Sequence, residues 1–193
     1  MNGAATPPTL LCLSGPPAVG KMTVGRELCR RTGYKLFHGH VVADALTPYF
    51  SHSTPAFTRL ASAWRRLFFE EAARAGLNVV TTVAWRFDLP EDAQTIGSWL
   101  EPYVEAGGRV LCVELLAPLA VCMQRNDDKD RRRHKNPYWV TDNYLRETAE
   151  AHWYGCGGAF PFDLPHLHVD TEHLSAEEAA RRIIDHFSLH STP

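Results

Sequence analysis

A short apolar segment, a glycine-rich loop and a helical pattern follow one another near the start of this chain and constrain its fold more than any other feature. The continuous hydrophobic run from Thr9 to Ser14 is typical of a strand buried on both faces. The next residues, from Gly15 to Thr23, have the spacing G-x4-G-K and lead directly into helical periodicity. Glycines allow such a loop to curl with its backbone N–H groups pointing inward, and the following helix adds the positive end of its dipole. The pattern predicts a phosphate-binding loop in which Lys21 reaches the β- and γ-phosphates of a nucleoside triphosphate.

The loop departs from the usual pattern at one position. The residue after the loop lysine is normally Ser or Thr, whose hydroxyl contacts Mg²⁺, but here it is Met22. A hydroxyl follows one residue later, at Thr23, which is therefore the candidate magnesium ligand, although phosphate oxygens and water can also hold the metal. The alternative is a turn that only joins a strand to a helix. The residues expected to contact the nucleotide are Gly15, Ala18, Val19, Gly20, Lys21, Met22 and Thr23.

Short apolar segments alternate with helical ones along the rest of the chain. Further strands are expected at 35–38, 77–83, 109–115 and 166–169, and helices at 22–31, 41–50, 55–75, 91–106, 118–125, 140–154 and 175–187. Ser175 and Glu178 have the spacing of a capping box. The alternation predicts an α/β fold with a parallel sheet covered on both faces, and ligands outside the carboxyl ends of the strands. With 193 residues, no internal repeat and no linker, a single domain over residues 1–193 is expected.

Composition excludes several classes of protein. Twenty Lys and Arg against twenty-two Asp and Glu give a formal net charge of −2, so long nucleic acid and anionic membranes are not expected partners. No segment approaches the roughly 18 apolar residues of a membrane span, and no secretory signal is recognisable. The five cysteines are odd in number and contain no C-x-x-C pair, which favours reduced thiols in a cytoplasmic protein.

The segment from Gly20 to Leu28, with Gly33-Tyr34 after it, resembles the start of shikimate kinases and related small P-loop kinases. Adenylate kinases are similar in lacking the hydroxyl after the loop lysine. The resemblance covers roughly the first 45 residues. It implies a three-layer P-loop NTPase fold with a five-stranded parallel sheet of order 2-3-1-4-5 and a helical lid. It also implies transfer of a phosphoryl group from ATP, with Mg²⁺, to a small hydroxyl-bearing acceptor.

The residues after the second expected strand are the first candidates for acceptor binding. Where shikimate kinases have Asp-x-Asp, this chain has His38-Gly39-His40, with Asp44 one helical turn later. His40 and Asp44 would share a helix face, and either could accept the proton of an attacking hydroxyl. Alternatives are a strand end that hydrogen-bonds the backbone, and a His-x-His metal pair. By resemblance, helices between about residues 40 and 75 bind the acceptor.

Further acceptor candidates lie on the third expected helix and after the third expected strand. Arg59 falls near the position where shikimate kinases place an arginine for the substrate carboxylate, although an exposed helix face is the alternative for it and for the neighbouring Arg65 and Arg66. Trp85 could stack on a flat acceptor. Asp88 could orient a magnesium-bound water or the acceptor, or only cap the turn that follows.

A charged stretch provides the candidate lid. Arg125 and Arg132 resemble the lid-base and lid arginines of small kinases, and the lid itself is expected at about residues 126–137. Such arginines neutralise charge that develops on the transferred phosphoryl group, and by the same resemblance Arg125 also contacts the nucleotide. A solvated charge run is the alternative. The segment 170–175 resembles the loop that walls the adenine in these kinases.

The sequence thus predicts an ATP-dependent phosphotransferase acting on a hydroxyl of a small molecule, such as an antibiotic or another secondary metabolite. Its expected partners are a nucleoside triphosphate with Mg²⁺ and that acceptor. Two other functions stay open. One is a nucleotide or polynucleotide kinase, and the other is a nucleotide-binding regulator without catalysis, which Met22 and the missing Asp-x-Asp would suit.

Overall fold

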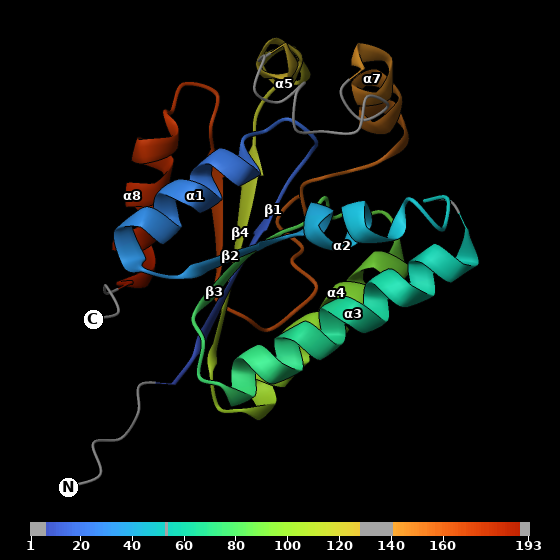
Figure 1. Cartoon of the computed structure of the whole chain (residues 1–193). Coiled ribbons are helices and arrows are strands. Elements are labelled where there is room, and N and C mark those ends of the chain that lie inside the picture. Colours follow the sequence, from blue (N-terminus) through green and yellow to red (C-terminus); the bar gives the residue numbers. More distant parts are fainter. Residues whose placement is uncertain (1–6, 53, 128–140, 190–193) are drawn as a thin grey trace, which may run out of the picture.

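The computed structural model describes residues 7–52, 54–127 and 141–189, and its centre is a parallel five-stranded sheet (Figure 1). The strands are β1 (Thr9–Ser14), β2 (Lys35–His38), β3 (Val79–Thr82), β4 (Arg109–Leu116) and β5 (His166–Asp170). Their order is β2-β3-β1-β4-β5, and every neighbouring pair is parallel. The predicted α/β fold and strand order are therefore confirmed.

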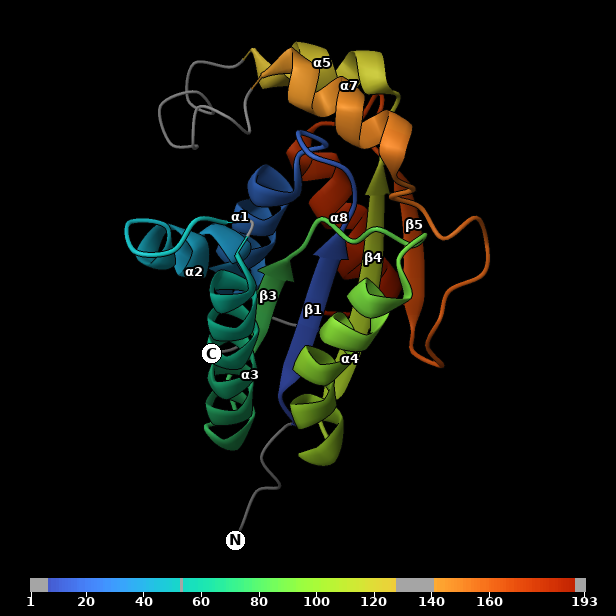
Figure 2. The same ribbon diagram turned by 90° about the vertical axis from the view of Figure 1, so that its right-hand side faces the viewer.

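Helices cover both faces of this sheet. They are α1 (Lys21–Thr32), α2 (Gly39–Leu46), α3 (Pro55–Arg74), α4 (Pro90–Glu105), α5 (Leu119–Asn126), α7 (Asp142–Ala151) and α8 (Ala176–Phe187). Figures 1 and 2 show α1 and α8 on one face and α3 and α4 on the other. Helices α5 and α7 pack together beyond the carboxyl ends of the strands (Figure 2). No helix in these described ranges is long and apolar enough to span a membrane.

The alternation of side chains along β1 builds two separate hydrophobic clusters. Leu11 and Leu13 point to the side of α1 and α8, where they pack in one cluster with Leu28 and Ile183. Leu10 and Cys12, together with Phe69, belong to the other cluster, on the side of α3 and α4. Successive residues of a strand point to opposite faces, so a strand in the middle of a doubly covered sheet must be apolar throughout. All six residues of β1 are buried, as its continuous hydrophobic run predicts.

The helix-terminal signals of the sequence are partly confirmed. Ser175 and Glu178 form the predicted capping box at the start of α8, and Gly33 ends α1 with a φ of 77°. Two helices are shorter than predicted. Helix α2 ends at Leu46 rather than at residue 50. Thr47 still has right-handed helical geometry, but Pro48 has no backbone N–H to continue the helical hydrogen bonds. Helix α7 ends at Ala151 rather than at 154, because His152 has an extended backbone.

Candidate active site

The loop between β1 and α1 has a backbone path that only glycine permits at two of its residues. Gly15 has a φ of 137°, and a Cβ placed there would lie 2.1 Å from the carbonyl oxygen of Leu115. Gly20 has a φ of 107°, although the space around it is open. Ala18, with a φ of 63°, adopts the left-handed conformation without being glycine. The loop is thus tightly curled against β4, as the predicted phosphate loop requires.

Lys21 is the first residue of α1, and its side chain folds back over the loop. Its ammonium group donates to the carbonyl oxygens of Gly15 and Pro16, at 2.6 and 2.7 Å. The charge is therefore held at the mouth of the curled loop, beside the N-terminus of α1. This is the arrangement that favours a bound anion, because the ammonium group and the helix dipole act at one place.

A cavity of about 1110 Å³ opens from this loop across the carboxyl ends of the strands. Typical cavities for a single small molecule measure roughly 300–1000 Å³, so this one has room for a nucleotide and a second small molecule. The residues predicted to bind nucleotide or acceptor that line the cavity are Ala18, Val19, Gly20, Lys21, Met22, Thr23, His38, His40, Asp44 and Arg125. Gly15 lies on the side of the loop that faces β4 and is not among the residues that line the cavity.

Arg125 joins three separate segments at the nucleotide end of the cavity. Its guanidinium donates to the Val19 carbonyl oxygen at 3.1 Å and to the hydroxyl and carbonyl oxygens of Thr171 at 3.1 and 2.5 Å. Thr171 belongs to the predicted adenine wall, and Leu174 and Ser175 of the same segment also line the cavity. Arg125 therefore fixes α5 and the β5–α8 loop against the phosphate loop.

The acceptor end of the cavity is formed by β2, α2 and α3. His38 ends β2, and His40 and Asp44 lie on α2. The rings of the two histidines have centroids 6.0 Å apart. The described structure thus brings together the three polar residues that the sequence identified as acceptor candidates, within one cavity with the phosphate loop.

Arg65 is the main acceptor-side residue that the prediction did not select. Its guanidinium donates to the carbonyl oxygens of Ala61 and Gly39, at 3.2 and 3.0 Å, and lies 5.1 Å from the centre of the Trp99 ring. Burial lowers the pKa of Arg65 to about 10, which leaves it charged at neutral pH. A half-buried cation that lines a cavity is well placed to bind an anionic group.

The sequence does contain a signal for Arg65. It lies four residues after Ala61 and four before Phe69, both of which are buried, so it is on the inner stripe of α3. Arg59 is outside that stripe. It is exposed and does not line the cavity, which agrees with the alternative of an exposed helix face, and its role as the acceptor arginine stays a prediction.

Trp85 is also placed differently from the prediction. Its side chain is only 1% exposed and does not line the cavity. The ring stacks on Phe87 at 4.5 Å and packs against Phe160 and Phe162. The sequence suggested an aromatic wall for the acceptor, but apolar partners from the α7–β5 loop cover the ring, and it belongs to the core.

The carboxylate of Asp88 contacts two other residues of the protein. One oxygen lies 2.9 Å from Nδ1 of His152, and the other accepts the backbone N–H of Trp153 at 2.8 Å. Asp88 is not among the residues that line the cavity, so this geometry does not support the predicted contact with magnesium or acceptor. Its contacts tie the end of α7 to the β3–α4 loop. The other predicted lid arginine, Arg132, lies outside the described residues, as does most of the predicted lid.

Comparisons with known proteins agree with this architecture. A family model described as an AAA domain matches residues 10–150, and the chain belongs to that family. The comparison with curated proteins finds no match. Among solved structures, a candidate kinase from Chloroflexus aurantiacus is 16% identical, with a TM-score of 0.65 over 96% of this chain and 98% of that one. The tunicamycin resistance protein of Deinococcus radiodurans is 22% identical, with a TM-score of 0.57 over 96% and 99%.

The resemblance found in the loop sequence extends to the whole fold. A shikimate kinase from Acinetobacter baumannii, solved with shikimate, is 15% identical, with a TM-score of 0.54 over 95% of this chain and 94% of that one. The fold is thus that of P-loop small-molecule kinases, as the resemblance implied. At these identities the similarity establishes the architecture, and the reaction must be argued from this chain's own residues.

Proposed function

We propose that this protein transfers the γ-phosphoryl group of ATP to a hydroxyl group of a small, anionic acceptor. The observation that carries the proposal is the continuity of one cavity from the phosphate loop with Lys21 to the polar residues of α2 and to Arg65. Phosphoryl transfer needs the two reactants in line within one water-excluding space. A nucleotide-binding protein without an acceptor would not need the second half of this cavity.

The nucleotide half supplies charge stabilisation. Lys21 leaves the loop carbonyls for the β- and γ-phosphate oxygens, whose negative charge attracts its ammonium group more strongly. Arg125 keeps the loop and the adenine-side segment in place. Magnesium requires oxygen ligands, and Met22 offers none, so Thr23 is the residue here that would hold the ion, together with phosphate oxygens and water. When bound, the ion neutralises charge on the transferred group.

The acceptor half supplies orientation and a proton acceptor. His40 or Asp44 takes the proton of the attacking hydroxyl, and both line the cavity on α2. Asp44→Asn and His40→Gln separate the two assignments. Loss of the base lowers kcat far more than nucleotide affinity and removes the corresponding step from the pH–rate profile, whereas the other variant keeps that step.

Arg65 indicates the class of acceptor. A half-buried guanidinium that lines the cavity favours an acceptor that carries a carboxylate, phosphate or sulfate beside its reactive hydroxyl. A charge-assisted hydrogen bond contributes roughly 1.5–3 kcal/mol, so Arg65→Met should raise the KM for the acceptor about 10- to 100-fold and leave ATP affinity unchanged. Arg59→Met, in the exposed arginine of the same helix, is the matched control and should change neither.

The first test is ADP release from Mg-ATP with a panel of hydroxyl compounds. The panel contains sugar acids, polyols, nucleosides, nucleotides, RNA ends and antibiotics, and Lys21→Ala is the catalytic control. Release that depends on an anionic small molecule other than a nucleotide and disappears in Lys21→Ala supports the proposal. Release stimulated only by RNA ends or nucleoside phosphates would assign a nucleotide or polynucleotide kinase instead. Tight ATP binding without release for any acceptor would refute catalysis and favour a regulator.

A further inference from the structure

A buried carboxylate interrupts the hydrophobic pattern of β4. Glu114 lies between Val113 and Leu115, both fully buried, and is itself only 2% exposed. An ionised carboxylate at such a position is costly unless cations or hydrogen-bond donors compensate its charge. Lys21 donates to the carbonyl oxygens of Gly15 and Pro16, and Glu114 is not among the residues that line the cavity. The surroundings of Glu114 therefore need their own explanation.

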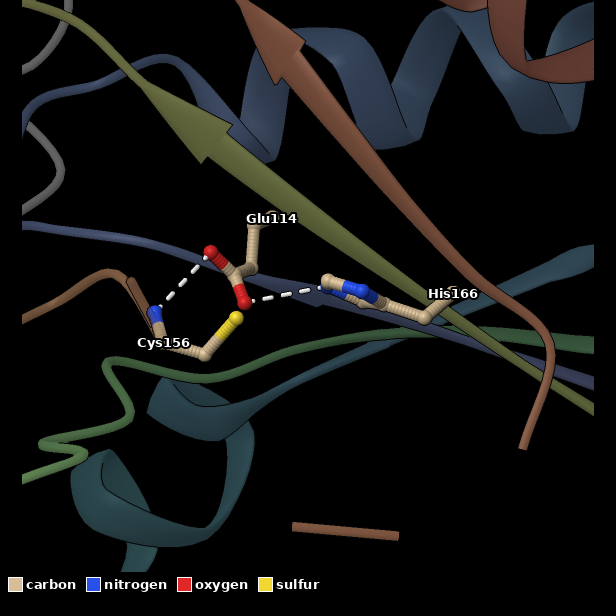
Figure 3. A group of neighbouring side chains, drawn as sticks. All are labelled: Glu114, Cys156 and His166. Atoms are coloured by element: carbon tan, nitrogen blue, oxygen red, sulfur yellow. Dashed lines mark hydrogen bonds and ion pairs between the residues drawn. The ribbon is translucent and has the colours of Figure 1, made fainter. Parts of the chain in front are cut away.

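Two potential metal ligands face this carboxylate, one from β5 and one from the loop after α7. His166 pairs in register with Cys112, two residues before Glu114, so both side chains lie on the same face of the sheet. Nε2 of His166 lies 3.0 Å from Oε1 of Glu114. The backbone N–H of Cys156 donates to Oε2 of Glu114 at 3.2 Å, and Figure 3 shows the thiol on the side of Oε1.

The close pair at the centre of this cluster is not satisfied by hydrogen bonding. Oε1 of Glu114 and Nε2 of His166 are both enclosed from solvent, and their 3.0 Å approach is not aligned for a hydrogen bond. Within the described ranges no other residue satisfies the two atoms by an aligned hydrogen bond, and the thiol of Cys156 is the side chain that also interacts with the Glu114 carboxylate. Two enclosed polar atoms without an aligned hydrogen bond, with a thiol beside them, are the arrangement expected where an ion or another ligand binds.

We propose that Glu114, Cys156 and His166 bind a divalent transition-metal ion, with Zn²⁺ as the best match. The sulfur, imidazole nitrogen and carboxylate oxygen lie within 4.8 Å of one another. Ligands of tetrahedral zinc are about 3.3–3.7 Å apart, given bonds of about 2.0–2.3 Å, so small side-chain rotations close the site. A mixed set of one thiolate, one imidazole and one carboxylate suits zinc, and it is too soft for Mg²⁺ or Ca²⁺. Water completes the fourth position.

Neighbouring residues hold the ligands in this orientation. The ring of His166 stacks on Phe160, with centroids 4.0 Å apart and an angle of 8° between the planes. A Cβ at Gly155 would lie 2.9 Å from the Leu116 side chain, so glycine allows the backbone before Cys156 to lie directly on β4. Metal ligands generally need such supporting contacts, which fix the rotamer before the metal binds.

The metal site would act as a clip, that is, it would fix the α7–β5 loop to the sheet. Cys156 belongs to that loop, while Glu114 and His166 belong to the sheet, so the metal would join the loop to the sheet core. The same chain segment carries His152 and Tyr154, which line the cavity. The clip is thus separate from the phosphate-binding residues and would stabilise one wall of the cavity without taking part in phosphoryl transfer.

The test is a titration of the purified full chain, stripped of metal, with Co²⁺ as a spectroscopic substitute for Zn²⁺. We expect one equivalent to bind with a thiolate-to-cobalt charge-transfer band, and Zn²⁺ to displace it and raise the Tm. Cys156→Ser should abolish the band, and His166→Gln should weaken binding about 100-fold or more, since even supporting residues contribute roughly 10- to 100-fold. Matched controls are Cys29→Ser, a half-buried cysteine on α1, and His168→Gln, exposed on β5.

Several results would overturn the proposal. One is the absence of stoichiometric binding, and another is a charge-transfer band that persists in Cys156→Ser but disappears in Cys29→Ser. An equal rise in Tm with Zn²⁺ in the parent protein and in Cys156→Ser would also exclude the site. Glu114→Gln separates metal binding from folding, because it keeps the side-chain shape. It should fold in the presence of a chelator yet lose the Zn²⁺-dependent rise in Tm.

Discussion

Replacing Gly15 with alanine should destabilise the protein far more than the same change at two other glycines of positive φ. The added Cβ would lie 2.1 Å from the Leu115 carbonyl oxygen, whereas real Cβ contacts essentially never fall below 3.0 Å. Strand β4 is held between β1 and β5, so it cannot give way cheaply. Overpacking of this kind costs about 1–3 kcal/mol and the backbone strain about 1–3 kcal/mol, so we expect a loss of roughly 2–6 kcal/mol.

Alanine substitutions at Gly20 and Gly76 test the cost of backbone strain alone, without the steric overlap expected at Gly15. Gly20 has a φ of 107° and Gly76 one of 69°, and an added Cβ meets nothing within 4 Å at either position. Gly76→Ala, at the end of α3, should therefore cost only the left-handed penalty of about 1–2 kcal/mol. Gly20→Ala should cost about 1–3 kcal/mol of strain and, because it alters the phosphate loop, weaken ATP binding as well.

The assay is urea unfolding at 25 °C, with free energies from linear extrapolation and ATP affinity measured on the same preparations. The expected order of destabilisation is Gly15→Ala, then Gly20→Ala, then Gly76→Ala. If Gly15→Ala costs no more than Gly76→Ala, the close approach of the loop to β4 does not exist in solution. If Gly20→Ala leaves ATP affinity intact, the curled loop is not the phosphate site.

Two further predictions concern the core and the acid stability of the protein. Trp85→Ala should lower the free energy of unfolding by about 3–5 kcal/mol, whereas Trp153→Ala, with 73% of its surface exposed, should change it by less than about 0.5 kcal/mol. Equal small effects would show that Trp85 is not a core residue. Hydrogen bonds from Arg30 and then Arg31 lower the pKa of Glu27 to about 2. A depressed carboxyl pKa stabilises the folded state above the unfolded pKa, and this contribution is lost as pH falls towards the folded value. The stability difference between the parent protein and Glu27→Gln should therefore shrink between about pH 5 and about pH 2 in urea titrations, and a constant difference would contradict the pairing.

The nucleotide half of the site could be predicted from the sequence because it is encoded locally. Consecutive residues from Gly15 to Thr23 form the loop, and their backbone conformations depend on glycine rather than on distant contacts. The order of strands followed from the same loop through its family resemblance, and the structure confirms it. The spacing of residues along the sequence is sufficient to predict a site that is built from the backbone of a single turn.

The residues at the other end of the cavity could be predicted only in part because they meet through tertiary packing. The sequence placed His38, His40 and Asp44 together since they follow β2 directly, and all three line the cavity. Arg59 was selected by position in the family rather than by helix face, and the buried stripe places Arg65 inward instead. The sequence placed Trp85 at the acceptor because an aromatic residue at the end of a strand gives the same pattern whether it is exposed to solvent or buried under another loop.

The phosphate loop and the side chains on α2 and α3 differ in how easily they can vary, and this bears on substrate specificity. In the proposed function, the nucleotide would be held by a loop in which Gly15 and Gly20 have backbone angles that favour glycine, so substitution there should cost stability. The acceptor would meet side chains on α2 and α3, and those positions can change without altering the backbone that carries them. Under this proposal Arg65 is the strongest such determinant, since its half-buried guanidinium lies over the Trp99 ring and lines the cavity. Acceptor preference should therefore respond to substitution at Arg65 while ATP binding stays constant, which is the behaviour expected when one P-loop scaffold serves different hydroxyl substrates.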